Sequence, residues 1–107
     1  MRINRENRQE ALRSAERKKR AQAEAVRLAN LLRQAMPSVV RVWGFGSTFE
    51  EGRPFSDSSD IDLAIEGGDL LSALSVVKDS EFRVDVTDLT NMDDGFAKAI
   101  REKGRVL

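Results

Sequence analysis

The chain has 107 residues, 18 of them basic and 18 acidic, so its formal net charge is zero, and it contains no His, Cys or Tyr. Without Cys and His, disulfide frameworks, thiol nucleophiles, zinc-thiolate sites and imidazole bases are excluded. The length fits one small domain, whose polar catalysis would have to use carboxylates, hydroxyls, Lys, Arg, backbone amides or a hard metal ion.

The charge is divided unevenly along the chain. Residues 1–36 hold ten basic and four acidic side chains, whereas residues 37–107 hold eight basic and fourteen acidic ones. Two oppositely charged halves suggest that each half meets a different partner. No apolar run approaches the roughly 20 residues of a membrane span, and no apolar segment follows the charged start, so we expect a soluble cytoplasmic protein without membrane contacts.

The first predicted element is a long helix that begins after Asn4, a candidate N-cap, and ends before Pro37. Its second half is amphipathic, with apolar residues at helical spacing: Ala25, Leu28, Ala29, Leu32 and Ala35. The first half has few apolar anchors, so we expect it to project from the domain. We therefore divide the chain into a basic helical extension, residues 1–20, and a domain, residues 21–107.

Three strands follow the long helix. β-branched and aromatic residues predict the first strand over residues 39–45, and alternating apolar residues predict the others over about residues 60–66 and 82–88. The segment between the first two strands, residues 46–59, is rich in Gly, Ser and Asp and is predicted to be irregular.

Two shorter helices complete the predicted elements. Asp69 is a candidate cap for the first, whose apolar positions are Leu70, Leu71, Leu74 and Val77. The second runs over about residues 92–103 and stops at Gly104. This order of elements predicts an α/β (α+β) fold with a three-stranded mixed sheet flanked by helices.

Two carboxylates share one face of the second strand. Asp60 and Asp62 alternate with apolar residues, and like charges so close repel one another unless a cation lies between them. A solvated edge strand whose acids prevent aggregation is one explanation. The third strand offers another, because Asp85 would complete an oxygen cage for one or two Mg²⁺ ions. Asp88, near the end of that strand, is the alternative third ligand.

Gly46 and Ser47 follow the first strand directly. Glycine lets the backbone approach a ligand closely, and serine can cap a helix whose amides bind phosphate. Ser47 is therefore a candidate to cap a short helix, to hold the triphosphate of a nucleotide, or to do both.

The stretch GFGSTFEEGRPFSDSSDIDLAI and the later FRVDV together resemble the minimal nucleotidyltransferases of the DNA polymerase beta superfamily. They are most similar to the small prokaryotic proteins that are encoded beside a HEPN-domain protein. The resemblance covers about residues 22–104 and implies the nucleotidyltransferase fold.

The resemblance also implies roles for individual residues. Gly46 and Ser47 would contact nucleotide phosphates, while Asp60, Asp62 and Asp85 would bind two Mg²⁺ ions and carry the catalysis. The implied reaction transfers an NMP, typically AMP from ATP, to a hydroxyl on a partner macromolecule. A HEPN-domain toxin as the partner would make this chain its antitoxin.

The sequence departs from the family pattern just after Gly-Ser. Thr48, Glu50 and Glu51 stand where a triphosphate would favour basic residues. Arg53 and Arg83 are the candidates to compensate, and Arg53 is our predicted additional nucleotide contact. The departure leaves a second function open, a catalytically weak or inactive module that neutralises its partner sterically.

The predicted helices carry further basic residues without an assigned role. The stretch Arg17–Arg20 is either a solvated helix face or a surface for RNA phosphates or an acidic partner. Lys98 and Arg101 on the last helix are candidates to approach a nucleotide. A homo-oligomer built on the long helix is also conceivable, although its Ala-rich spacing disfavours a coiled coil.

Overall fold

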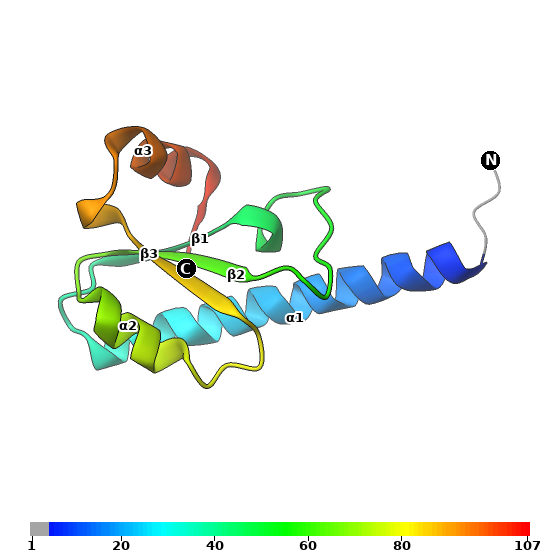
Figure 1. Cartoon of the computed structure of the whole chain (residues 1–107), viewed down its shortest axis with the longest axis horizontal. Coiled ribbons are helices and arrows are strands. Elements are labelled where there is room, and N and C mark those ends of the chain that lie inside the picture. Colours follow the sequence, from blue (N-terminus) through cyan, green and yellow to red (C-terminus); the bar gives the residue numbers. More distant parts are fainter. Residues whose placement is uncertain (1–4) are drawn as a thin grey trace.

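A computed structural model describes residues 5–107, with side chains from residue 8 onward (Figure 1). Its elements follow in the order α1 (Arg5–Ala35), β1 (Arg41–Phe45), the 3-10 helix η1 (Gly46–Thr48), β2 (Ile61–Glu66), α2 (Leu70–Val77), β3 (Val84–Asp88), the 3-10 helix η2 (Leu89–Asn91), α3 (Asp94–Lys103) and β4 (Arg105–Val106). The predicted α+β class and the long first helix are confirmed. The predicted cap Asn4 lies outside the described residues.

The four strands form one mixed sheet in the order β3-β2-β1-β4. β2 and β3 run parallel and are joined through α2, whereas β1 is antiparallel to both β2 and β4. The predicted number of strands, three, was therefore wrong by one. β4 has only two residues, Arg105 and Val106, and a strand that short carries no periodicity that a sequence pattern could show.

Helices cover both faces of this sheet (Figure 1). α1 and α2 pack on one face, where the larger core includes Leu28, Leu32, Val42, Leu63 and Ile65. α3 packs on the other face over a smaller cluster, formed by Trp43, Ala64, Leu89, Ala97 and Ile100. Alternate residues of β2 thus face opposite layers, as the sequence pattern predicts.

Only the second half of α1 is buried against the sheet. Its buried positions are Ala21, Ala25, Leu28, Ala29 and Leu32. Residues 8–20 are exposed or half-buried, and Leu12 is 60% exposed. The helix continues without a break past residue 20, so the division of the chain there stays a prediction. Although α1 is long, neither it nor any other helix within residues 5–107 is apolar enough to cross a membrane.

α2 begins at its predicted cap. The Asp69 carboxylate accepts hydrogen bonds from the backbone N–H of Ser72 at 2.9 Å and from its hydroxyl at 2.7 Å. The buried face differs from the predicted one, because Leu71 is 76% exposed, Leu74 is 40% exposed and Ala73 is buried. In a helix of eight residues, contacts with α1 and β3 decide which face is buried, and apolar spacing alone does not.

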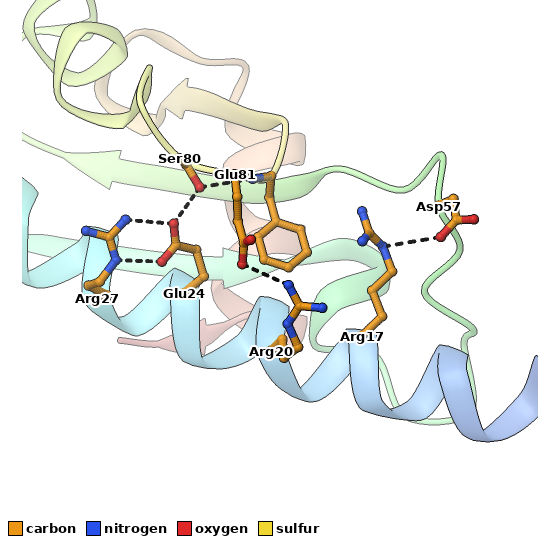
Figure 2. A network of polar contacts seen from close by, with 8 residues as sticks. Arg17, Arg20, Glu24, Arg27, Asp57, Ser80 and Glu81 are labelled. Atoms are coloured by element: carbon orange, nitrogen blue, oxygen red, sulfur yellow. Dashed lines mark hydrogen bonds and ion pairs between the residues drawn. The ribbon is translucent and has the colours of Figure 1, made fainter.

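A polar network fastens α1 to the segment that precedes β3 (Figure 2). The Glu24 carboxylate accepts two hydrogen bonds from Arg27, at 2.6 and 2.7 Å, and one from the Ser80 hydroxyl at 2.5 Å. One turn earlier, Arg20 pairs with Glu81 at 3.0 Å. The bond from Arg27 holds the pKa of Glu24 below its ordinary value. Part of the basic half of the sequence therefore meets the acidic half within the molecule.

Candidate functional site

The three predicted carboxylates lie at one end of β2 and β3. The two strands pair in parallel with Asp62 directly opposite Asp85, and Asp60 immediately precedes β2. Ile61 and Leu63, which alternate with the acids, are fully buried in the core beside α1. Because alternate strand residues face opposite sides, Asp62 and Asp85 face the α3 side of the sheet.

The surroundings of Asp62 disfavour its charged form. Partial burial raises the pKa of Asp62 from 3.8 to about 6, and the negative charges of Asp85 and Asp60 add to the shift. Arg53 acts in the opposite direction. Both causes penalise the charged carboxylate, so a cation placed among these acids would relieve the repulsion.

Asp60 faces a cation of the chain itself. Its Oδ1 lies 3.3 Å from Nε of Arg83, which the sequence analysis named as a candidate to compensate for the acidic residues after Gly-Ser. That oxygen is buried, yet no donor within the described part of the chain is aligned to form a hydrogen bond with it. Asp60 therefore retains an unsatisfied lone pair despite its ion pair.

The chemistry of this donor set fits a hard divalent cation. Carboxylate oxygens are the ligands that Mg²⁺ prefers, and the buried Oδ1 of Asp60 has no hydrogen-bond donor among residues 8–107. The side chains do not stand as a finished coordination cluster, however. Among residues 8–107, no three acidic side chains lie close enough together to hold a metal ion. Arg83 already pairs with the Asp60 carboxylate and would compete with a metal ion for it.

Gly46 brings the backbone against Asp62. It has a φ of +71°, in the region that favours glycine, and it opens η1. A Cβ at this position would collide with the Asp62 carboxylate. Ser47 is buried within η1, and no side chain caps that helix, because Phe45 occupies the cap position. The interpretation of Ser47 as a helix cap was therefore wrong.

A pocket of about 290 Å³ lies between the η1 segment and α3. Three of the predicted residues, Gly46, Arg53 and Asp62, contribute to its wall. Aromatic side chains supply much of the remaining wall, namely those of Phe45, Phe49 and Phe96. A pocket that combines apolar surface with carboxylate and cationic groups suits an aromatic ligand that carries anionic groups. Asp60 and Asp85 lie outside this wall.

The predicted contact Arg53 is paired with the acidic residue that departs from the family pattern. Nη1 of Arg53 lies 2.6 Å from the Glu50 carboxylate. This hydrogen bond is the main cause that lowers the pKa of Glu50. The pair neutralises Glu50 beside the pocket, but it also engages the guanidinium that a phosphate would need.

α3 contributes four pocket residues that the sequence analysis did not assign to the site, namely Phe96, Ala99, Ile100 and Lys103. Phe96 and Lys103 line the pocket, and the ring of Phe96 meets that of Phe45 edge to face at 6.3 Å. Seven positions separate Phe96 from Lys103, which places them on one helix face, and this spacing was the available signal. Lys98 and Arg101, the predicted candidates on this helix, form ion pairs with other acids.

Asp88, the alternative third ligand, caps η2 instead. Its Oδ1 accepts a hydrogen bond from the N–H of Thr90 at 3.0 Å, and its Oδ2 accepts one from the Asn91 amide at 2.7 Å. The strand register places Asp88 opposite Ile65, at the far end of β3 from Asp85. Its position and its occupied oxygens both separate it from the other acids.

The fold is similar to that of known minimal nucleotidyltransferases. No protein-family model matches the chain, and no curated protein matches its sequence. One similar structure is the MntA chain in a crystal structure of a mutant toxin–antitoxin MntA-HpeT, with 18% sequence identity, a TM-score of 0.59, and coverage of 79% of this chain and 70% of that chain. Another contains the tri-AMPylated Shewanella oneidensis HEPN toxin in complex with MNT antitoxin, whose antitoxin chain matches with 18% identity, a TM-score of 0.54, and coverage of 83% of this chain and 70% of that chain. The chain therefore has the nucleotidyltransferase fold that the resemblance implies.

Proposed function

We propose that this chain is a nucleotidyltransferase that transfers AMP from ATP to a hydroxyl of a partner macromolecule, and that it acts as the antitoxin of a HEPN toxin. The observation that carries the proposal is the strand register that sets Asp62 opposite Asp85, with Asp62 in the wall of a pocket that has cationic side chains. The fold shared with two antitoxin structures supports the same class.

The carboxylates form the catalytic part of the proposed site. Asp60, Asp62 and Asp85 would hold two Mg²⁺ ions, which would stabilise the charge that develops on the transferred phosphoryl group. Asp85 is the most exposed of the three acids, so it is the one positioned to accept the proton of an incoming hydroxyl. Asp62, half-buried and at the pocket wall, would face the nucleotide side.

The other predicted residues would hold ATP. The backbone at Gly46 and Ser47 would contact the β- and γ-phosphates, and Arg53 would add a charge-assisted hydrogen bond. Lys103 supplies a second cation in the pocket wall. The apolar wall around Phe96 offers a surface on which a nucleobase can pack.

The proposed reaction balances without a further reactant. The acceptor oxygen forms a bond to the α-phosphorus of ATP, and the bond from that phosphorus to the bridging oxygen breaks. The hydroxyl proton passes to Asp85, and pyrophosphate leaves. Because this chain contains no Tyr, an acceptor of tyrosine type has to come from the partner.

A HEPN-domain protein is the partner that we propose. The two similar structures contain antitoxin chains of HEPN toxin complexes, one of them with a toxin described as tri-AMPylated. AMP on the toxin is the product that the proposed reaction would leave there. We propose that the partner supplies the surface that presents the acceptor hydroxyl.

The test is label transfer from ATP to the partner. The chain is incubated with ATP labelled at the α-phosphate, Mg²⁺ and a purified HEPN-domain toxin as the acceptor. We expect label on the partner, and we expect Asp60→Ala and Asp62→Ala to abolish the transfer. Asp79→Asn, which changes an exposed acid in the turn after α2, is the matched control and retains it. No label with the unaltered chain contradicts the proposed activity.

Steric neutralisation is the second candidate function. It is favoured by two ion pairs within the site, because Asp60 already faces Arg83 and Arg53 already binds Glu50. This function predicts that the chain suppresses the toxin without label transfer and that Asp60→Ala and Asp62→Ala suppress it equally well. The same set of variants therefore separates the two functions.

A further inference from the structure

Three side chains of α1 donate hydrogen bonds to backbone carbonyls of the segment that follows β1. The Ser14 hydroxyl donates to the carbonyl of Phe55 at 3.2 Å, and Nε2 of Gln22 donates to the carbonyl of Thr48 at 2.8 Å. Lys18 lies midway between these two donors. Because the three residues are spaced by four positions, they form one column along the helix.

Lys18 is the central member of this column and contacts two carbonyls at once. Its Nζ donates to the carbonyl of Arg53 at 2.7 Å and also to that of Glu50. The backbone N–H of Arg53 donates to the same Glu50 carbonyl at 3.4 Å. The ammonium group therefore ties together both ends of the turn from Glu50 to Arg53.

Besides Lys18, the turn is held by the backbone bond from Arg53 to Glu50 and by the ion pair between their side chains. Residues 51–54 are all exposed, and Gly52, with a φ of +75°, has open space where a side chain would stand. Its backbone conformation is thus fixed by hydrogen bonds and not by apolar burial. Arg53, at the end of the turn, lines the same pocket as Asp62.

The neighbours of Lys18 also turn toward the domain. The Arg17 guanidinium lies 5.0 Å from the ring centroid of Phe82, and Arg20 pairs with Glu81 at 3.0 Å. The basic stretch 17–20 thus uses three of its four cations inside the molecule. This arrangement favours an internal role for the stretch, whereas contact with RNA stays a prediction.

We infer that Lys18 is a positioning residue of the nucleotide pocket, which holds the Glu50–Arg53 turn so that Arg53 reaches the phosphates. The inference deepens the proposed function and rests on it for the identity of the ligand. Lys18 itself does not line the pocket, so its effect on a ligand passes through Arg53. Without the Lys18 ammonium, the turn would lose two hydrogen bonds to α1, and we expect Arg53 to be held less firmly beside Asp62.

Three variants of the full chain test this role. Lys18→Met removes the donors while it keeps the length of the side chain, and Lys18→Arg restores donors. Lys19→Met removes an equal charge from the adjacent exposed position. The measurements are the Kd of ATP with Mg²⁺ by calorimetry, the KM and kcat of label transfer, and hydrogen exchange of the Glu50 and Arg53 amides.

We expect Lys18→Met to raise the Kd and KM for ATP about tenfold, as for the loss of a charge-assisted hydrogen bond. kcat and the midpoint of thermal unfolding should stay close to those of the unaltered chain, while exchange of the Glu50 and Arg53 amides becomes faster. Lys18→Arg should recover most of the affinity, and Lys19→Met should change none of these values. A merely structural role for Lys18 would lower the unfolding midpoint and leave affinity unchanged.

Two results would overturn the inference. One is an unchanged Kd with Lys18→Met, and the other is an equal loss of affinity with Lys19→Met, which would indicate a general charge effect. If the unaltered chain does not bind ATP, the proposed function fails, and the exchange data alone decide the inference. Faster exchange at Glu50 and Arg53 in Lys18→Met but not in Lys19→Met would then support the positioning of the turn, and equal exchange would refute it.

Discussion

Asp62 and Asp85 lie directly opposite each other on parallel strands, on the face of the sheet that carries α3. Like charges in directly opposed positions destabilise a sheet. A proton on Asp62 or a cation beside the pair relieves this repulsion. Partial burial first, and the charge of Asp85 second, raise the pKa of Asp62 to about 6. The stability of the fold is therefore expected to depend on both pH and divalent ions.

The first prediction concerns pH. Because the pKa of Asp62 in the folded chain is above its ordinary value of 3.8, the stability that the protonated acid provides is present below about pH 4 and is lost as the pH rises through 6. The Asp62→Asn variant has no carboxyl to ionise at this position, so it does not lose stability in this way as the pH rises. Above pH 7 the variant should be more stable than the unaltered chain by about 1 kcal/mol, a value reduced for solvent exposure. Urea unfolding at several pH values checks this, and a stability difference that does not change with pH would contradict it.

The second prediction concerns Mg²⁺. If the acids bind the ion only in the folded chain, Mg²⁺ at tenfold its Kd should raise the free energy of unfolding by about 1.4 kcal/mol. Asp62→Asn should lose this gain, and Arg83→Met should bind Mg²⁺ more tightly because the competing guanidinium is gone. Unfolding with Mg²⁺ is compared with unfolding in NaCl of equal ionic strength. An equal effect of both salts would argue against a site.

The third prediction compares two glycines. Gly46 and Gly52 have nearly the same positive φ, +71° and +75°, but only Gly46 packs its Cα against the Asp62 carboxylate. Gly52→Ala should cost about 1 kcal/mol for the backbone conformation alone. Gly46→Ala should cost roughly 1–3 kcal/mol more, since a side chain has to be displaced. Denaturant titration measures both, and equal costs would show that Asp62 moves aside freely.

The fourth prediction separates the two glutamates that follow Gly-Ser. Glu50 binds Arg53, whereas Glu51 is simply exposed. Glu50→Gln should release Arg53 and tighten ATP binding about two- to threefold, in proportion to the small strength of an exposed ion pair. Glu51→Gln removes an equal charge and should have a smaller effect. Identical changes in Kd would mean that only the total charge near the pocket matters.

The sequence was sufficient to predict that Asp62 and Asp85 share one face of the sheet, but not that Asp60, Asp62 and Asp85 do not form a metal-binding cluster among the described residues. Strand periodicity sets the side of each strand on which its acid lies, and the pairing of β2 with β3 puts the two acids opposite each other. Helix limits were also readable, since Pro37 and Gly104 interrupt helical conformation. These features depend on neighbours within a few residues, which a local pattern contains.

Features that depend on distant neighbours were not predictable in the same way. β4 exists because Val106 pairs with Trp43, and no local pattern marks a two-residue strand. The buried position of Ala73 depends on how α2 packs against α1 and β3. Lys18 was interpreted only as part of a basic stretch that is a solvated helix face or a surface for RNA or an acidic partner. The carbonyls that it binds lie 32 and 35 residues further along the chain, beyond the reach of a local pattern.

That separation has a consequence for the order of folding. A contact between residues this far apart costs loop-closure entropy before it stabilises the chain, so we expect the contacts of Lys18 with the Glu50–Arg53 turn to be absent from the folding transition state. Lys18→Met should then leave the refolding rate unchanged, and any effect should appear in the unfolding rate alone. The turn beside the pocket would become ordered late in folding and would open early in unfolding.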